Sequence, residues 1–209
     1  MVKPNLILIG AGGHAHACID VIEQQGKYKI AGLVGVPEEV HSEHFGYSVI
    51  ATDGELGKLA KSYRYAFIAV GQIQSAAVRI KLHQQIVDLG FQLPFVVAPS
   101  AYVSNHATIG EGSIVMHGAI VNAGAKVGRN SIINTRALVE HGATVEDHCH
   151  ISTGAVLNGN VFVGAASYVG SGSIIKEGVS LGRGCVVGMG LCVRHNQADQ
   201  VRFVGNDKT

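Results

Sequence analysis

From Val97 onward, an aliphatic residue recurs at every sixth position of the chain without an insertion. Seventeen consecutive positions follow this rule: Val97, Val103, Ile109, Val115, Val121, Val127, Ile133, Val139, Val145, Ile151, Leu157, Val163, Val169, Ile175, Leu181, Val187 and Val193. The fifth residue of each six is nearly always small, as at Ala101 and Ala107. Residues six apart do not share one face of a helix. The pattern therefore predicts a parallel β-helix in which the branched residue fills the interior and the small residue lies under a bend.

Glycine is concentrated in the second and fourth positions of the sixes, as at Gly110 and Gly112 or at Gly182 and Gly184. We expect glycine at both positions to supply backbone conformations that other residues disfavour. The interior is aliphatic throughout, so this unit should fold without a metal ion or a disulfide.

The first 96 residues follow a different pattern. Short apolar runs at 6–9, 30–34 and 65–70 alternate with helix-like segments at 14–25 and 74–89. This alternation is typical of βαβ units and a parallel sheet. The predicted organisation is an α/β, Rossmann-like domain at 1–96, a β-helix domain at 97–194 and a C-terminal tail at 195–209.

Composition narrows the possible functions. Sixteen Lys and Arg against 15 Asp and Glu leave a formal net charge of +1, so no basic excess indicates a nucleic-acid partner. No run approaches about 18 apolar residues, and the first residues lack a signal-peptide pattern. We expect no membrane insertion and a cytoplasmic protein. The four cysteines form no CxxC pair, and we expect them to be reduced.

The uninterrupted repeat over 97–193 resembles the hexapeptide repeat of left-handed β-helix acyltransferases. The resemblance implies that three sixes form one triangular coil, that acetyl-CoA lies in a groove between neighbouring prisms, and that the protein is a homotrimer with active sites between subunits.

Acyl transfer to an amine or hydroxyl needs a base, and imidazole suits this role near neutral pH. Five histidines lie in the repeat: His106, His117, His141, His148 and His150. With eighteen residues per coil, the neighbours of His141 are Ala123 and Gly159, which leave open space beside its ring, whereas His117 stacks with Thr135 and Thr153. His141 is therefore the candidate base.

The segments 139–141, 150–155 and 158–161 resemble the nucleotide-sugar N-acetyltransferases that make diacetylated bacillosamine, and the related sialic-acid O-acetyltransferases. The resemblance implies that His141 is the general base and that His150 contacts acetyl-CoA. The positions of Ser171, Gly188 and Met189 match coenzyme-contacting backbone. In the bacillosamine enzymes an acidic residue follows the catalytic histidine, but here Gly142 does. Asn134, a backbone carbonyl or a neighbouring subunit could orient His141 instead.

A glycine-rich loop joins the first predicted strand to the first helix. Gly10, Gly12 and Ala15 satisfy the spacing of a dinucleotide-binding loop, but the acid expected about twenty residues later is missing. A nicotinamide-dependent dehydrogenase is therefore disfavoured. The loop resembles the Gly-x-Gly-His start of the sugar acetyltransferases, which implies that Gly12, Gly13, His14 and Gly71 contact the nucleotide sugar. Those enzymes often carry acids after the second strand, where this chain has Val34 and Gly35.

Together these features predict an acetyl-CoA-dependent N-acetyltransferase that acts on the 4-amino group of a UDP-linked sugar, with His141 as base and without a metal ion. The alternatives are O-acetylation of sialic acid and N-acetylation of another nucleotide sugar such as perosamine. A zinc carbonic anhydrase on the same β-helix is disfavoured, because no two histidines of the repeat differ by 18 or 36. A non-catalytic scaffold would bind the coenzyme weakly and would not need His141.

Overall fold

The computed structural model describes residues 2–205, which form two compact units. The first contains residues up to Gly71 together with Ala77–Val97, and the second contains Gln72–Ala76 and the chain from Ala98 onward. Five residues inside the predicted first domain thus pack with the β-helix.

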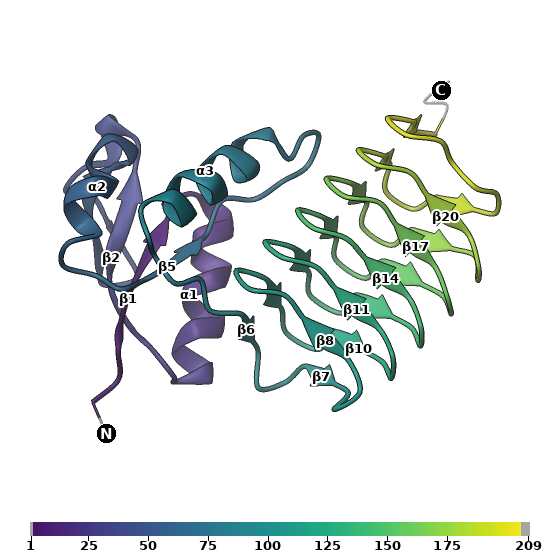
Figure 1. Cartoon of the computed structure of the whole chain (residues 1–209), viewed down its shortest axis with the longest axis horizontal. Helices are drawn as coiled ribbons and strands as arrows, with labels where there is room; N and C mark the ends of the chain where they lie inside the picture. Colours follow the sequence, from purple (N-terminus) through teal and green to yellow (C-terminus); the bar gives the residue numbers. More distant parts are fainter. Residues whose placement is uncertain (1, 206–209) are drawn as a thin grey trace. The chain divides into compact units, whose positions relative to one another are not determined.

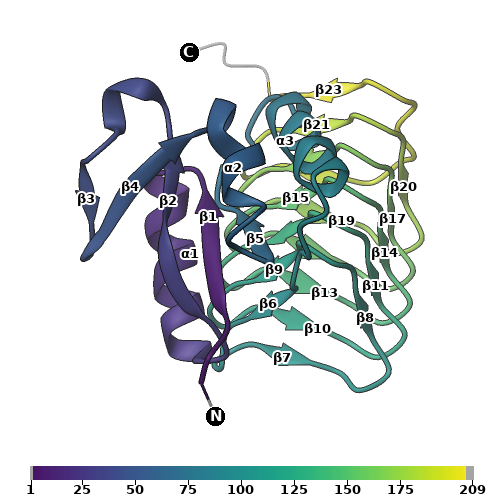
Figure 2. The ribbon, with the colours of Figure 1, turned by 60° about the vertical axis from the view of Figure 1, so that its left-hand side comes forward.

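The first unit is a five-stranded sheet with helices on both faces (Figure 2). The sheet order is β3-β4-β2-β1-β5, with all pairs parallel except β3 with β4. Its elements are β1 (Asn5–Ile9), α1 (Gly13–Gln25), β2 (Lys29–Gly35), η1 (Pro37–Glu39), β3 (Glu43–His44), β4 (Tyr47–Thr52), η2 (Asp53–Glu55), α2 (Leu56–Leu59), β5 (Tyr65–Ile68), α3 (Ala77–Asp88) and β6 (Val96–Val97). The predicted strands and helices are all present, and the β3–β4 hairpin was not foreseen.

Strand β1, which lies between β2 and β5, is covered on both faces. Successive residues of a strand point to opposite sides, and Leu6, Ile7, Leu8 and Ile9 are all fully buried. Ile7 and Ile9 belong to a cluster that includes Leu82 and Ile86 of α3, Leu56 of α2 and Phe91. The opposite face carries α1, whose Ile19 and Ile22 are also fully buried. The carboxyl ends of the strands therefore meet at one open edge, where ligands bind in such sheets.

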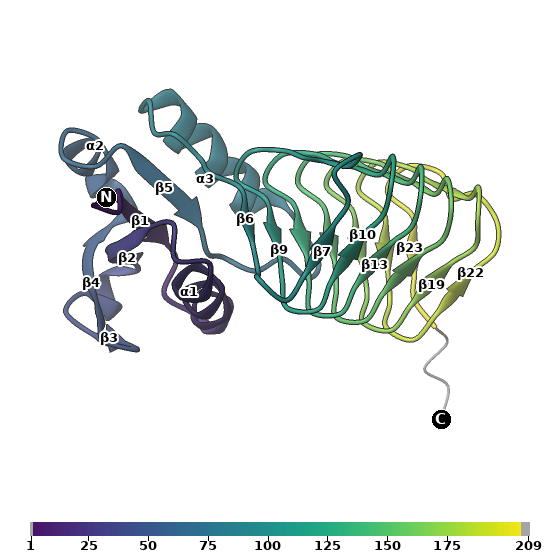
Figure 3. The same cartoon turned by 90° about the horizontal axis from the view of Figure 1, so that it is seen from below.

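The second unit is a triangular prism of stacked coils (Figures 1 and 3). Its two-residue strands are β7 (Tyr102–Val103), β8 (Thr108–Ile109), β9 (Ile114–Val115), β10 (Ile120–Val121), β11 (Lys126–Val127), β12 (Ile132–Ile133), β13 (Leu138–Val139), β14 (Thr144–Val145), β15 (His150–Ile151), β16 (Val156–Leu157), β17 (Phe162–Val163), β18 (Tyr168–Val169), β19 (Ile174–Ile175), β20 (Ser180–Leu181), β21 (Val186–Val187), β22 (Cys192–Val193) and β23 (Arg202–Phe203). Every third strand pairs in parallel, which builds three flat faces.

We name the faces by their strands. Face I carries β7, β10, β13, β16, β19 and β22, face II carries β8, β11, β14, β17 and β20, and face III carries β9, β12, β15, β18, β21 and β23. The second residue of each strand is the aliphatic residue of the six, and from Val115 to Val193 every one of these is buried. The six-residue pattern and the eighteen-residue coil are both confirmed, and the prism is a left-handed β-helix.

Glycine serves two different purposes at the corners. From Gly112 to Gly190, every fourth-position residue has a positive φ, including Asn130 at 50° and His148 at 60°. The expectation of an unusual backbone conformation is confirmed there. It is wrong for the second position, where Gly128 and Gly170 do not have positive φ. Instead, a Cβ atom on Gly170 would lie 2.5 Å from the carbonyl carbon of Gly188, so the second position needs glycine for space.

The predicted tail continues the prism as far as it is described. The backbone N–H of Gly182 donates to the carbonyl of Gln197 at 2.9 Å, and β23 pairs with β21. Residues 206–209 of the predicted tail lie outside the described residues. Cys18, Cys149 and Cys185 are buried and Cys192 is exposed, all as free thiols. Burial raises the pKa of the Cys18 and Cys149 thiols to about 12.

The two kinds of corner glycine predict opposite rankings of substitutions. At Gly154, with φ of 65° and open space around its Cβ position, asparagine should destabilise the protein less than alanine, because asparagine tolerates the left-handed region. At Gly170, alanine should lower the free energy of unfolding by about 1–3 kcal/mol, because its methyl group overpacks the corner. Asparagine at this position should be at least as destabilising as alanine. Urea unfolding of the four variants measures both rankings, and the same order at both positions would contradict this account.

Candidate active site

His141 lies at a corner of the prism between β13 and β14, on the edge that joins face I to face II. The turn is closed by the N–H of Ala143, which donates to the carbonyl of Glu140 at 3.1 Å. The carboxylate of Glu140 accepts the backbone N–H of His141 at 3.0 Å. Glu140 therefore fixes the backbone of the turn and does not bond the imidazole, which is exposed.

The coil above holds the His141 ring in place. Asn160 N–H donates to the carbonyl of His141 at 3.0 Å, and Gly142 N–H donates to the carbonyl of Ala123 at 3.2 Å. His141 is thus stacked between Ala123 and Gly159, as its eighteen-residue spacing predicts. A Cβ atom on Gly159 would lie 2.7 Å from Cε1 and 2.8 Å from Nε2 of His141. The ring occupies the space that the missing side chain leaves.

Gly142 and Asn160 form the reverse arrangement. Gly142 has φ of 65°, and its Cβ position is taken by Oδ1 of Asn160. His141 therefore reaches up over Gly159, while Asn160 reaches down over Gly142. An acidic side chain at position 142 would collide with Asn160, which gives a steric reason for the glycine at this departure from the bacillosamine enzymes.

His150 lies on a different face, at β15 of face III. It is 6% exposed, its Nε2 is 3.0 Å from Nδ2 of Asn134, and its Nδ1 is 2.5 Å from the carbonyl oxygen of Gln72. These partners assign the proton to Nδ1, and the ring edge packs against Tyr168 at 5.3 Å between centroids. Both ring nitrogens are bonded, so the ring offers the coenzyme no free nitrogen here, and its contact with acetyl-CoA stays a prediction.

The other predicted coenzyme positions lie on the second edge of face I, where it meets face III. The hydroxyl of Ser171 is 2.9 Å from that of Ser152, and the N–H of Gly188 donates to the carbonyl of Phe203 at 2.8 Å. Met189 is 79% exposed. Within one chain, these residues and His141 therefore stand on opposite edges of the same face.

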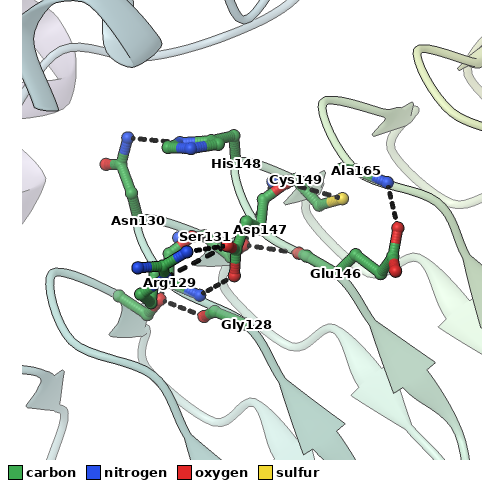
Figure 4. Close-up of polar contacts among 10 residues, drawn as sticks. Gly128, Arg129, Asn130, Ser131, Glu146, Asp147, His148, Cys149 and Ala165 are labelled. Carbon is green, nitrogen blue, oxygen red and sulfur yellow. Dashed lines mark hydrogen bonds and ion pairs between the residues drawn. The ribbon is translucent and has the colours of Figure 1, made fainter. Parts of the chain in front are cut away.

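The polar segment at 146–150 supports the third corner, between faces II and III (Figure 4). Arg129 Nε and Nη2 lie 3.1 and 2.8 Å from Oδ2 of Asp147, and Oδ1 accepts the backbone N–H of Arg129 at 2.7 Å. Burial by itself raises the pKa of Asp147, but the hydrogen bonds and charge of Arg129 outweigh it and lower this pKa. Nδ2 of Asn130 lies 2.9 Å from Nδ1 of His148, and Oε2 of Glu146 accepts the backbone N–H of Ala165 at 2.9 Å. These contacts join successive coils.

In the first unit, the four predicted substrate residues lie close to the ends of β1 and β5. Gly12 is the N-cap of α1, Gly13 begins the helix, and a Cβ atom on either would meet nothing within 4 Å. Gly71 follows β5, and its Cβ position is 3.4 Å from Cβ of His14. The ends of β1 and β5 are where the strand order reverses, and α1 begins there without a side-chain cap, as at sites that bind an anion.

Sequence reasoning missed one carboxylate at this edge. Glu39 folds back so that its Oε2 accepts the N–H of Val36 at 3.1 Å, at the end of β2. The only sequence signal is the three-residue spacing of a capping box, and it is weak because Val36 is not a usual capping residue.

Residues 2–205 contain no cluster of three or more His, Cys, Asp or Glu that could hold a metal ion. Over the same residues, no helix is long and apolar enough to cross a membrane.

Two family profiles match the chain: the PglD N-terminal domain at residues 5–86 and the hexapeptide repeat of succinyl-transferase at residues 160–194. No curated protein sequence matched in a separate comparison. With its left-handed β-helix of hexapeptide repeats, the chain is an acyltransferase of the hexapeptide class.

Solved structures narrow the class. A histidine-to-asparagine variant of perosamine N-acetyltransferase from Caulobacter crescentus, in complex with CoA and GDP-perosamine, is 30% identical, with a TM-score of 0.91 over 99% of this chain and 96% of that chain. The acetyltransferase domain of PglB from Neisseria gonorrhoeae FA1090, in complex with acetyl coenzyme A, is 31% identical, with a TM-score of 0.89 over 98% of both chains. WeeI from Acinetobacter baumannii AYE shares the fold at 22% identity, with a TM-score of 0.76 over 97% of this chain and 98% of that chain. The chain belongs to the left-handed β-helix family of sugar N-acetyltransferases.

Gly159→Ala tests the seat of the imidazole. The new methyl group would lie within 3 Å of two ring atoms of His141, so the ring should be displaced. A misplacement of about 1 Å should lower kcat about 100-fold, while Gly90→Ala, where a Cβ meets nothing within 4 Å, should leave kcat within about twofold. NMR of the His141 ring and steady-state kinetics check this. An unmoved ring with an unchanged kcat would show that Gly159 does not position it.

Proposed function

We propose that the protein transfers the acetyl group of acetyl-CoA to the 4-amino group of a UDP-linked amino sugar, of the kind that leads to diacetylbacillosamine, for glycan biosynthesis in the cytoplasm. The observation that carries this proposal is the exposed imidazole of His141, seated over Gly159 on a prism corner. Two structural relatives at 30% identity or more support the proposal. The perosamine N-acetyltransferase variant was solved with CoA, and the PglB acetyltransferase domain was solved with acetyl-CoA. One of them was solved with a histidine replaced.

The chemistry assigned to His141 is general base catalysis. The neutral amine attacks the thioester carbonyl carbon, a C–N bond forms, and the imidazole takes the proton that the amine loses. The C–S bond then breaks, the thiolate of CoA leaves, and the imidazolium returns the proton to sulfur. Base catalysis of this kind contributes about 10²–10⁴-fold to the rate. No metal ion is needed for this sequence of steps.

The first unit would hold the nucleotide sugar. Gly12, Gly13 and His14 at the start of α1 would bind the pyrophosphate, because backbone N–H groups and the helix dipole favour an anion there. Gly71, which follows β5, adds no side chain next to His14. Neither residue 34 nor residue 35 supplies an acid for the nucleoside.

A homotrimer would complete the site. The outward residues of face I form an apolar column along the prism: Tyr102, Ile120, Leu138, Val156, Ile174 and Cys192. Tyr102 is 58% exposed and Ile174 is 43% exposed. If face I packs against other copies, His141 on one edge of a protomer approaches the edge with Ser171, Gly188 and Met189 on its partner. We propose that acetyl-CoA lies between these edges, with His150 on the coenzyme side.

The rival N-acetylation is that of a different nucleotide sugar. The perosamine enzyme, solved with GDP-perosamine, is as similar to this chain as the PglB domain, so a GDP-linked 4-amino sugar is the second candidate. O-acetylation of free sialic acid, the third candidate, would leave the first unit without a nucleotide to bind.

The test is a substrate panel. Purified protein with acetyl-CoA and UDP-, GDP- or dTDP-linked 4-amino sugars, or free sialic acid, should release thiol fastest with a UDP-linked amino sugar. His141→Ala should lower kcat at least about 100-fold with little change in acetyl-CoA binding. His195→Ala, at an exposed position of the same corner three coils away, is the matched control and should keep full activity. Turnover of sialic acid alone would overturn the nucleotide-sugar assignment, and full activity of His141→Ala would overturn the base.

The proposed trimer has its own test. Ile174→Glu places a charge on the apolar column of face I and should dissociate the trimer, because an interface core excludes unpaired charge. Phe162→Glu is the control, because Phe162 is 37% exposed but lies on face II. Light scattering after gel filtration gives the mass of each. A trimeric Ile174→Glu variant would place the interface elsewhere, and a monomeric wild type would overturn the trimer itself.

A further inference from the structure

The carboxylate of Glu39 lies directly against the last residue of β2. Its Oε2 accepts the backbone N–H of Val36 at 3.1 Å, and the same oxygen lies 2.6 Å from the position that a Cβ atom on Gly35 would occupy. The side chain therefore turns back from the end of η1 onto the carboxyl end of the strand.

Space, rather than backbone conformation, explains the glycine at position 35. Gly35 is not among the residues with positive φ, so another residue could adopt its backbone. A side chain there would collide with the carboxylate of Glu39 and come within 3.1 Å of Cγ1 of Val49. Gly35 is buried, and it leaves room for a carboxylate that arrives from four residues further along the chain.

This carboxylate lies at the carboxyl end of β2, on the other side of β1 from β5. β2 is the neighbour of β1 in the sheet, and the N–H of Gly10 donates to the carbonyl of Val34 at 2.7 Å. In parallel sheets that bind nucleotides, phosphates lie at the helix that follows β1, and an acid at the end of β2 accepts the ribose hydroxyls. In this chain, Gly12 and Gly13 at the start of α1 leave space for the phosphates. Glu39 supplies an acid at the end of β2.

We propose that Glu39 binds the ribose of the nucleotide sugar and makes the site selective for ribonucleotides over 2′-deoxyribonucleotides. This inference rests on the proposed function. A carboxylate has about four acceptor positions, of which the N–H of Val36 uses one, so two vicinal hydroxyls can both donate to it. A deoxyribose donates only one. UDP- and GDP-linked sugars therefore fit the site, and dTDP-linked sugars do not.

The chain contains a matched comparison for the simpler role of Glu39 as a cap. Glu55, at the end of η2, accepts the N–H of Thr52 at 3.2 Å in the same three-residue box, and it also pairs with Lys58 at 3.3 Å. However, Glu55 follows β4, which is one strand further from β1. If both carboxylates only cap a short helix, the two substitutions to glutamine should have the same effect on nucleotide binding.

The experiment compares calorimetric affinities of wild type, Glu39→Gln and Glu55→Gln for UDP, GDP and their 2′-deoxy forms. Wild type and Glu55→Gln should bind each ribonucleotide about tenfold or more tightly than its deoxy form, as for a hydrogen bond to a charged group. Glu39→Gln should lose this preference and bind the deoxy forms within about twofold of wild type. The KM for acetyl-CoA should not change.

Two further variants separate charge from packing. Gly35→Ala keeps the carboxylate but pushes it away, and it should reduce the ribose preference. Gly35→Asp combined with Glu39→Ala supplies a carboxylate from the strand itself and should restore it. Thermal unfolding of every variant identifies any variant that does not fold. The ribose preference is then compared among the variants that do fold.

The outcomes distinguish this inference from the proposed function. The ribose role of Glu39 is overturned if the Glu39→Gln variant keeps the preference for ribonucleotides. It is also overturned if this variant binds ribonucleotides and deoxyribonucleotides more weakly by the same factor. If that variant acetylates a UDP- or GDP-linked sugar with the wild-type KM for the sugar, the ribose role is also overturned, but the proposed function is not. A wild type that binds neither UDP nor GDP overturns both.

Discussion

Backbone hydrogen bonds between successive coils of eighteen residues hold the second unit together, and each aliphatic side chain of the interior stacks on its counterpart one coil away. This arrangement sets the spacing of everything on the corners, because each coil rises by the same step. Since the interior supplies the burial, the corner residues can change without loss of the core. His141, Asn160, Met189 and Asp147 are all such corner residues, and their different chemistry is carried on the same backbone.

The close fit between coils explains why the prism could be predicted from the sequence in detail. The shape is repeated in every coil, so a period of six, with a small residue and a glycine at fixed positions, is visible without any knowledge of long-range contacts. The neighbours of His141 follow from counting eighteen residues in each direction. The purpose of the second-position glycines could not be obtained in this way, because the collision that excludes a side chain involves the backbone of another coil.

The first unit was less predictable, and the reasons are local. The β3–β4 hairpin lies at the edge of the sheet, and β4 alternates buried and exposed residues over a short length. The segment Gln72–Ala76 follows the last predicted strand of the first unit but packs with the prism, where Gln72 bonds His150 and Ser167. His150 points outward like other residues that precede an interior aliphatic, and its burial comes from this segment. The position of Glu39 depends on a side-chain rotamer, which no pattern of residue types records.

Gly35 and Gly142 are two places where this chain lacks an acid that its relatives were expected to carry, and they share one feature, although only Gly142 also has a positive φ. In each case a polar side chain from elsewhere, Glu39 or Asn160, fills the volume next to the glycine. The two members of each pair therefore constrain each other's mutational history. An acid at position 35 or 142 would require its counterpart to move aside or to become smaller, so the effect of a substitution at one position depends on the residue at the other.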